Sequence, residues 1–211
     1  MTASSDSNHA AGSSPIRDLL RVHALPLALV LLSTLFAAMG QQATAWLRYD
    51  RAAILHGQWW RIISGNIVHL GWPHLLLNLV GLILVWLLFR QTLTTRSWIL
   101  VTLVSAAAVS CGLLLFDPHL EWYVGLSGVL HGLFAAGLVA ALYAGNRGDW
   151  WLLALFIAKI TWEQTVGSMP GSAEIAGGNV IVDAHLYGAI GGTVAVLSII
   201  LTKKRRRPRT P

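Results

Sequence analysis

The stretch GLSGVLHG at residues 125–132 places a serine and a histidine at the start of a long apolar block. That block, 126–144, is one of six; the others cover residues 25–46, 72–93, 98–116, 150–167 and 180–201. A helix needs about 20 apolar residues, and at least about 17, to cross a bilayer. The pattern therefore predicts an all-α polytopic membrane bundle of six transmembrane helices, in which the fourth and fifth are near the minimum length.

The composition supports a membrane protein. Of 211 residues, 55% are hydrophobic and 11% are charged, whereas a soluble domain carries about 25% charged residues. This excludes a disordered chain and disfavours a soluble enzyme. The single cysteine, Cys111, excludes a disulfide framework. The net charge is +6, but the basic residues flank the apolar blocks, which indicates membrane topology rather than nucleic-acid binding.

The distribution of basic residues predicts the orientation. If the N-terminus is inside, eleven basic residues lie on inner segments and three lie on outer loops, which fits the positive-inside rule. We therefore expect a disordered cytoplasmic tail at 1–16, a membrane domain at 17–202 and a basic cytoplasmic tail at 203–211. The first block resembles a signal peptide, with Ala43-Thr44-Ala45 as a cleavage site, but its length and the polar tail before it favour an uncleaved span.

The first outer loop, residues 47–71, is long and carries Trp59 and Trp60 among few charges. This composition predicts an amphipathic segment that lies in the headgroup layer. An ordinary interfacial anchor is the alternative, because a Trp pair alone would support no more than that.

Four polar residues share one depth within the predicted bundle. His74 and Asn78 lie near the outer end of the second span, Ser127 begins the fourth, and His185 lies about 8 Å into the sixth at 1.5 Å per residue. Such groups are costly inside a membrane. Their convergence from three separate helices predicts one site in the outer half of the bilayer, open toward the outer face.

Ser127 has two interpretations, because a serine between glycines at a helix start can simply be an N-cap. As a nucleophile it needs a base within about 3 Å. His131, four residues later on the same helix, competes for that role with His185 on another helix. We favour His185, because small residues recur every four positions on both the fourth and sixth spans and let these helices pack closely.

The remaining polar residues are assigned supporting roles. His74 and Asn78, at i and i+4 on one helix face, are candidate hydrogen-bond donors to an oxyanion, together with the backbone N–H of Ser127; a structural hydrogen bond between helices is the alternative. Asp183 faces away from His185, so we expect a Ser–His dyad, with Asp183 stabilising the helix N-terminus. The other candidates, which are either structural or substrate-facing, are an expected i, i+4 ion pair and the second histidine: Lys159, Glu163 and His131.

These residues resemble the motifs of rhomboid intramembrane serine proteases. The resemblance rests on Trp60-Arg61 in the first outer loop, on the His74 and Asn78 pair, on Gly125-Leu126-Ser127-Gly128, and on Ala184-His185 with Gly188, and it covers all six spans. It implies that Ser127 is the nucleophile, that His185 is the base, and that His74 and Asn78 assist the oxyanion. It implies no metal and no cofactor.

Several details resemble a bacterial subgroup, the rhombosortases: the compact six-span form, the 125–132 stretch, and Lys159 with Trp162-Glu163-Gln164. That resemblance implies transmembrane substrates with a C-terminal Gly-Gly-type sorting tail, which are released or re-anchored after export. It also implies a multi-pass protein of the bacterial inner membrane, with both termini cytoplasmic, whose partners are such substrates and the lipid bilayer.

Two other functions compete with an intramembrane protease. A catalytically silent rhomboid-like protein that binds membrane clients would be expected to lack the serine or the histidine, and both are present here. A transporter that uses the intramembrane histidines would place its site nearer the bilayer midplane, beside a broken helix.

Overall fold

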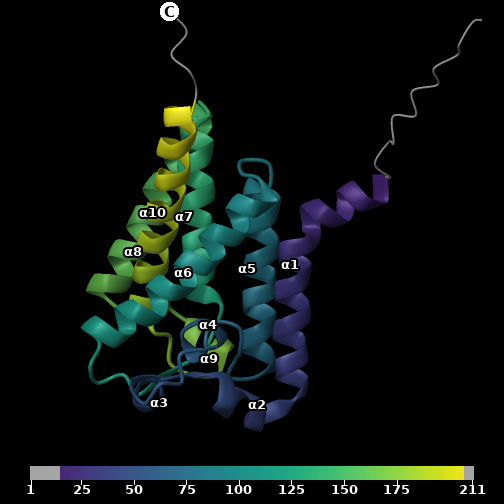
Figure 1. Cartoon of the computed structure of the whole chain (residues 1–211). Helices are drawn as coiled ribbons and strands as arrows, with labels where there is room; N and C mark the ends of the chain where they lie inside the picture. Colours follow the sequence, from purple (N-terminus) through teal and green to yellow (C-terminus); the bar gives the residue numbers. More distant parts are fainter. Residues whose placement is uncertain (1–14, 207–211) are drawn as a thin grey trace, which may run out of the picture.

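The computed structural model describes residues 15–206 and is built from helices, which confirms the predicted all-α membrane fold (Figure 1). The long helices are α1 (Pro15–Ala38), α5 (Trp72–Phe89), α6 (Thr95–Phe116), α7 (Ser127–Tyr143), α8 (Trp150–Thr165) and α10 (Val182–Arg206). The short elements are α2 (Gly40–Leu47), β1 (Tyr49–Asp50), α3 (Arg51–Leu55), α4 (Arg61–Ser64), β2 (Trp122–Tyr123), the 3₁₀ turn η1 (Arg147–Asp149) and α9 (Ser172–Ala176).

Each predicted apolar block overlaps one long helix, but the helices differ in their capacity to cross a membrane. Within the described residues, α5, α6 and α10 are long and apolar enough to span it alone, and α1 with α2 passes the same test as a bent pair. Helix α7 has 17 residues and α8 has 16, so both fall at or below the usual minimum.

The first predicted span, 25–46, is not one continuous helix. Helix α1 already begins at Pro15 and ends at Ala38, and the chain then bends by 119° into α2. Gly40 has a φ of +77°. This left-handed conformation suits glycine and interrupts the regular helix.

Helices extend into the inner ends of both expected tails. Pro15 and Ile16 belong to α1, and residues 203–206 continue α10 as helix, because Lys and Arg are good helix formers that extend an existing helix. The rest of both expected tails, 1–14 and 207–211, lies outside the described residues.

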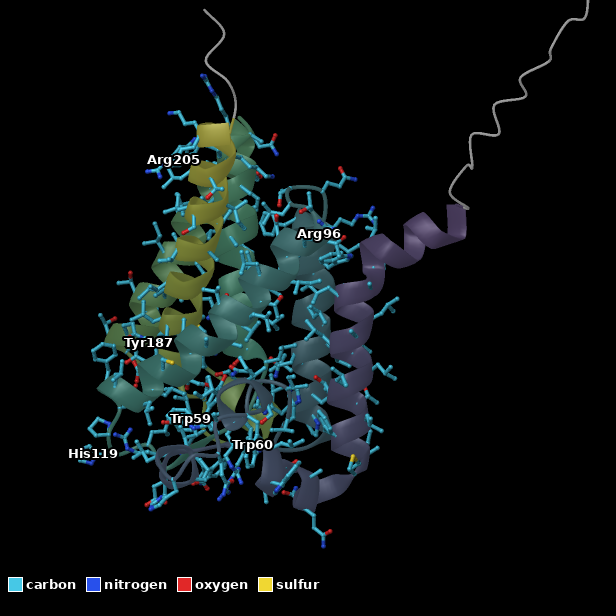
Figure 2. All side chains as sticks on the ribbon, viewed as in Figure 1. Trp59, Trp60, Arg96, His119, Tyr187 and Arg205 are labelled. Carbon is cyan, nitrogen blue, oxygen red and sulfur yellow. The ribbon has the colours of Figure 1, made fainter. Side chains whose placement is uncertain are left out.

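The start of α1 and the end of α10 lie at one end of the bundle, and α2, α3 and α9 lie at the other (Figure 1). Arg96 and Arg205 mark the first end, whereas Trp59 and Trp60 mark the second (Figure 2). Helices α5, α7 and α10 all begin at the second end. Residues in their first turns are therefore brought to one level.

Residues 48–71 form a folded cap over the second end of the bundle. Strand β1 pairs antiparallel with β2, with Tyr49 opposite Tyr123. Ile54 and Val68 are fully buried, while Trp59 is 65% exposed. The segment thus combines a packed interior with exposed tryptophan of the kind found at membrane interfaces.

Arg61 holds this cap together. Its side chain is buried and donates hydrogen bonds to the backbone carbonyls of Ala45 and Arg48 at 3.0 and 2.9 Å, and to Gln58 Oε1 at 2.7 Å. A buried guanidinium is tolerated only when its N–H groups are satisfied. The cap in turn supports β2, which lies four residues before Ser127.

Helices α7 and α10 pack backbone against backbone. A Cβ added at Gly188 would collide with the carbonyl oxygen of Gly128, and one added at Gly192 would collide with that of Gly132. These are the small-residue faces that the sequence indicates for the fourth and sixth spans. Their contact sets the separation of the two helices that carry Ser127 and His185.

The close packing predicts that Gly188→Ala destabilises the protein by at least about 1–3 kcal/mol, because the two backbones must separate to admit the methyl group. Thermal unfolding in detergent measures this. Gly148→Ala is the matched control, since an added Cβ there meets nothing within 4 Å. Equal unfolding temperatures for the two variants would contradict the proposed tightness of the contact.

Candidate active site

Ser127 is the first residue of α7 and is positioned by a glycine turn. Gly125 has a φ of +130°, and its N–H donates to the carbonyl of Gly65 in the cap at 3.2 Å. A Cβ at Gly125 would come within 2.8 Å of the His74 ring. Glycine is therefore needed here both for the backbone conformation and for the close approach of α5.

Ser127 and His185 are in hydrogen-bond contact, with 3.0 Å between Ser127 Oγ and His185 Nε2. On the other side of the ring, His185 Nδ1 lies 3.1 and 3.0 Å from the two carboxylate oxygens of Glu163. A carboxylate only accepts hydrogen bonds, so Nδ1 carries the proton and Nε2 keeps its lone pair. This is the tautomer that can take a proton from the serine hydroxyl.

A second chain of contacts leads through His131. Glu163 Oε1 lies 2.7 Å from Lys159 Nζ, and Lys159 Nζ lies 2.8 Å from His131 Nε2. An ammonium only donates, so His131 Nε2 accepts and its Nδ1–H donates to the carbonyl of Ser127 at 2.7 Å. The His131 and His185 rings stack, with centroids 4.0 Å apart and 15° between their planes. The two histidines thus contact different parts of Ser127: His131 contacts its backbone carbonyl, and His185 contacts its hydroxyl.

The structure places Glu163 beside His185, whereas the sequence predicts for it an ion pair with Lys159 or a substrate-facing role. Glu163 lies two residues before the end of α8, and His185 lies three residues after the start of α10. Both residues therefore lie close to the same end of the bundle, and their matching depths in the sequence are the signal that could have indicated the contact. Asp183 lies in the first turn of α10 as expected, and its charge acts on Asp117.

His74 and Asn78 line the same cavity as Ser127. His74 Nδ1 accepts from the N–H of Leu70 at 3.4 Å, which leaves Nε2 as the protonated nitrogen. Asn78 donates one amide hydrogen to the carbonyl of His74 at 2.9 Å and keeps a second. Both side chains therefore retain one N–H donor that no contact within α5 uses.

Two buried residues that no motif marks frame these groups. Tyr123, in β2, donates its hydroxyl to the carbonyl of Gly125 at 2.8 Å and interacts with Ser127, and burial raises its pKa to about 12. His69 lies beside His74 with ring centroids 5.1 Å apart. Burial, with a smaller contribution from His74, lowers the pKa of His69 to about 3, so it stays neutral at pH 7.

The site opens into a cavity of about 1050 Å³ between α5, α7, α8 and the segment from α9 to α10. Ser127, His185, His131, Lys159 and Glu163 all line it. Most of the other lining residues on the long helices are apolar, among them Leu77, Val85, Leu130, Phe134, Leu155 and Phe156. An apolar cavity with a few convergent polar groups is the usual form of a binding site.

One group of side chains has metal-ligand geometry. Within the described residues, ligand atoms of His131, Glu163 and His185 lie within 4.8 Å of one another. The Lys159 ammonium, however, contacts both Glu163 and His131. A second cation placed there would be repelled by this charge, so the donor set does not suit a metal.

A helical membrane fold with a serine hydroxyl in contact with a histidine ring is the arrangement expected of an intramembrane serine hydrolase. The profile of the Rhomboid domain family matches residues 56–202. The chain therefore belongs to the rhomboid family, whose proteases are serine peptidases that act on transmembrane substrates in the bilayer. It is a multi-pass membrane protein.

The curated relatives are similar at modest identity. The chain is 25% identical over 153 residues to YdcA, a rhomboid protease homologue of Bacillus subtilis, covering 72% of this chain and 73% of YdcA. It is 26% identical over 160 residues to the rhomboid protease GluP of Bacillus subtilis, covering 73% of this chain but 29% of GluP. An uncharacterized protein of Mycobacterium bovis, Mb1372, is 26% identical over 159 residues, covering 70% of this chain and 62% of Mb1372.

The contacts predict that the two histidines differ in importance. His185→Ala should lower kcat for a single-span substrate by at least about 10³-fold, because Ser127 loses its proton acceptor. His131→Ala removes a stacked ring and a contact to Lys159, and measurable turnover should remain. A cleavage assay on purified, folded variants tests the ranking, and the reverse order would contradict it.

Proposed function

We propose that this chain is an active intramembrane serine endopeptidase, with Ser127 as the nucleophile and His185 as the general base. The 3.0 Å contact between Ser127 Oγ and His185 Nε2 carries the proposal. The Nδ1 contact with Glu163 supports it, because it leaves the Nε2 lone pair facing the hydroxyl. A silent client-binding protein would not need this tautomer, and a transporter would not need a serine there.

The reaction follows the usual acyl-enzyme route. His185 Nε2 takes the hydroxyl proton as Ser127 Oγ bonds to the carbonyl carbon of the scissile peptide, and the C=O electron pair moves onto oxygen. When this intermediate collapses, the C–N bond breaks and His185 returns the proton to the leaving amine. Water then attacks the acyl-enzyme by the same steps, which releases the new carboxylate and restores Ser127.

The oxyanion has three candidate donors at the site: the Nε2–H of His74, the second amide hydrogen of Asn78 and the backbone N–H of Ser127. The first N–H groups of α7 have no intrahelical partner and lie at the positive end of the helix dipole. Donors held in place before the reaction stabilise the developing charge without reorganisation.

The substrate is a single-span membrane protein that is cut near the outer face. With both termini of the enzyme cytoplasmic, as the distribution of basic residues indicates, the end of the bundle with Ser127 faces outward. A transmembrane helix hides its carbonyls in hydrogen bonds, so the client must unwind locally. Glycine eases this step, because it is about 1 kcal/mol less favourable in a helix than alanine.

The finer assignment is to a rhombosortase-like enzyme of the bacterial inner membrane, with exported clients that carry a C-terminal Gly-Gly-type sorting tail. The compact chain, the 125–132 stretch, and Lys159 with the Trp162-Glu163-Gln164 run support it. A client tail of this kind joins a small-residue motif to one transmembrane helix and a basic end. Its glycines then lie at the boundary where Ser127 acts.

Removal of one oxyanion donor should lower kcat by about 10²–10³-fold. We expect His74→Ala and Asn78→Ala each to lose this much turnover while the proteins still insert and unfold cooperatively. Steady-state kinetics in detergent or liposomes provides the measurement. Full kcat in both variants would reduce the two residues to packing contacts.

The glycines of the client decide cleavage if the substrate assignment is correct. Replacing a Gly-Gly motif at the outer boundary with Leu-Leu should block release of the ectodomain although the client still inserts, because local unwinding becomes harder. Mass spectrometry of the released fragment locates the cut, and the Ser127→Ala enzyme is the control. A cut on the cytoplasmic side, or equal cleavage of the Leu-Leu client, would refute the assignment.

A further inference from the structure

Helix α8 carries one buried side chain, and it is a carboxylate. Glu163 is 3% exposed, whereas every other α8 residue is half-buried or exposed. A carboxylate is expensive to bury in a membrane bundle unless it is paired and hydrogen-bonded. The burial of this particular residue on an otherwise peripheral helix therefore needs a reason.

The contacts of Glu163 point mainly at His185. Both carboxylate oxygens lie within 3.1 Å of His185 Nδ1, and one of them also contacts Lys159. The Lys159 side chain is 35% exposed. An ion pair alone could form at this more exposed position without taking the carboxylate inward, so the pairing with Lys159 does not account for the burial.

No other group near His185 is placed to accept the hydrogen bond from its Nδ1. His131 stacks on the face of the ring, and its own nitrogens are used by Lys159 and the Ser127 carbonyl. Asp183 is two residues from His185 on the same helix and acts on Asp117 instead. Among the described residues, the structure gives Nδ1 one acidic partner, Glu163.

We propose that Glu163 is the third member of the catalytic unit, as a positioning residue for His185. This inference deepens the proposed serine protease activity and rests on it. The carboxylate holds His185 in the tautomer with Nε2 free and fixes the plane of the ring. When Nε2 takes the serine proton, the carboxylate stabilises the imidazolium without itself becoming protonated.

Lys159 positions Glu163 in turn. Its ammonium contacts Glu163 Oε1 and the Nε2 of His131, so it ties α8 to α7 and neutralises the carboxylate when His185 is uncharged. The order of contacts is Ser127, His185, Glu163 and Lys159. Loss of Glu163 therefore removes the partner of His185 itself, whereas loss of Lys159 leaves that carboxylate in place and disturbs only its neighbours, Glu163 and His131.

The test compares Glu163→Gln with Lys159→Gln. Glutamine has the shape of glutamate, but its amide can donate to Nδ1 and impose the wrong tautomer on His185. For Glu163→Gln we expect kcat to fall by about 10²–10⁴-fold with KM changed less than about threefold, as for loss of the acid in other serine triads. Lys159→Gln should lose at least about tenfold less, because the carboxylate remains.

Glu174→Gln is the matched control, since it makes the same chemical change on an exposed residue of α9 and should keep the wild-type kcat. Glu163→Asp retains the charge on a side chain one methylene shorter, so its kcat should lie between those of the wild type and Glu163→Gln. If Glu163→Gln does not fold, the Asp variant decides, and a wild-type kcat in it would overturn the proposal.

Each failure has its own signature. If the wild-type protein shows no cleavage that depends on Ser127, the proposed protease activity fails. If it cleaves and Glu163→Gln keeps its kcat, or if Glu163→Gln and Lys159→Gln lose equal activity, the protease stands and the positioning role falls. Labelling of Ser127 by a fluorophosphonate probe gives a second readout, because it reports serine activation without client binding.

Discussion

The backbone contact between α7 and α10 is the constraint on which the rest of the site depends. Neither Ser127 nor His185 can adjust its position along its own helix, so the separation of the two helices decides whether Oγ and Nε2 meet. Gly128, Gly132, Gly188 and Gly192 allow that separation because none of them carries a side chain at the contact. Membrane helices gain little from burying apolar surface against one another, and close backbone packing replaces that driving force.

Much of the fold and part of the candidate site could be predicted from the sequence. The lengths of the apolar blocks predicted the approximate positions of the six long helices. The depths of the polar residues within those blocks predicted that Ser127 and His185 lie at one level. The bend after Ala38 was missed, because residues 25–46 were taken as one apolar block although Gly40, Gln41 and Gln42 interrupt it. The pairing of Glu163 with His185 was missed as well, since Lys159 at i−4 offers Glu163 a partner on its own helix and the depths of Glu163 and His185 were not compared.

The charges at the site form a chain rather than a cluster. Lys159 contacts Glu163 and His131, Glu163 contacts His185, and His185 contacts Ser127. Each buried charge has an opposite or hydrogen-bonding neighbour, which is the condition under which ionised groups persist away from water. The same contacts specify the protons on both imidazole rings, so electrostatic balance and the chemical state of the base have one structural origin.

Helix α8 is held to the bundle differently from its neighbours. Helices α7 and α10 interlock through their backbones, whereas α8 fully buries only Glu163 and packs Leu152, Leu153 and Phe156 partly against the core. A sideways displacement of α8 by a few ångströms would break the contact between Glu163 and His185, even if the backbone contact between α7 and α10 stayed intact. The position of α8 and the orientation of the His185 ring are therefore coupled. A change in lipid thickness or lateral pressure that shifts α8 would alter the activation of Ser127 without any direct contact between α8 and the serine.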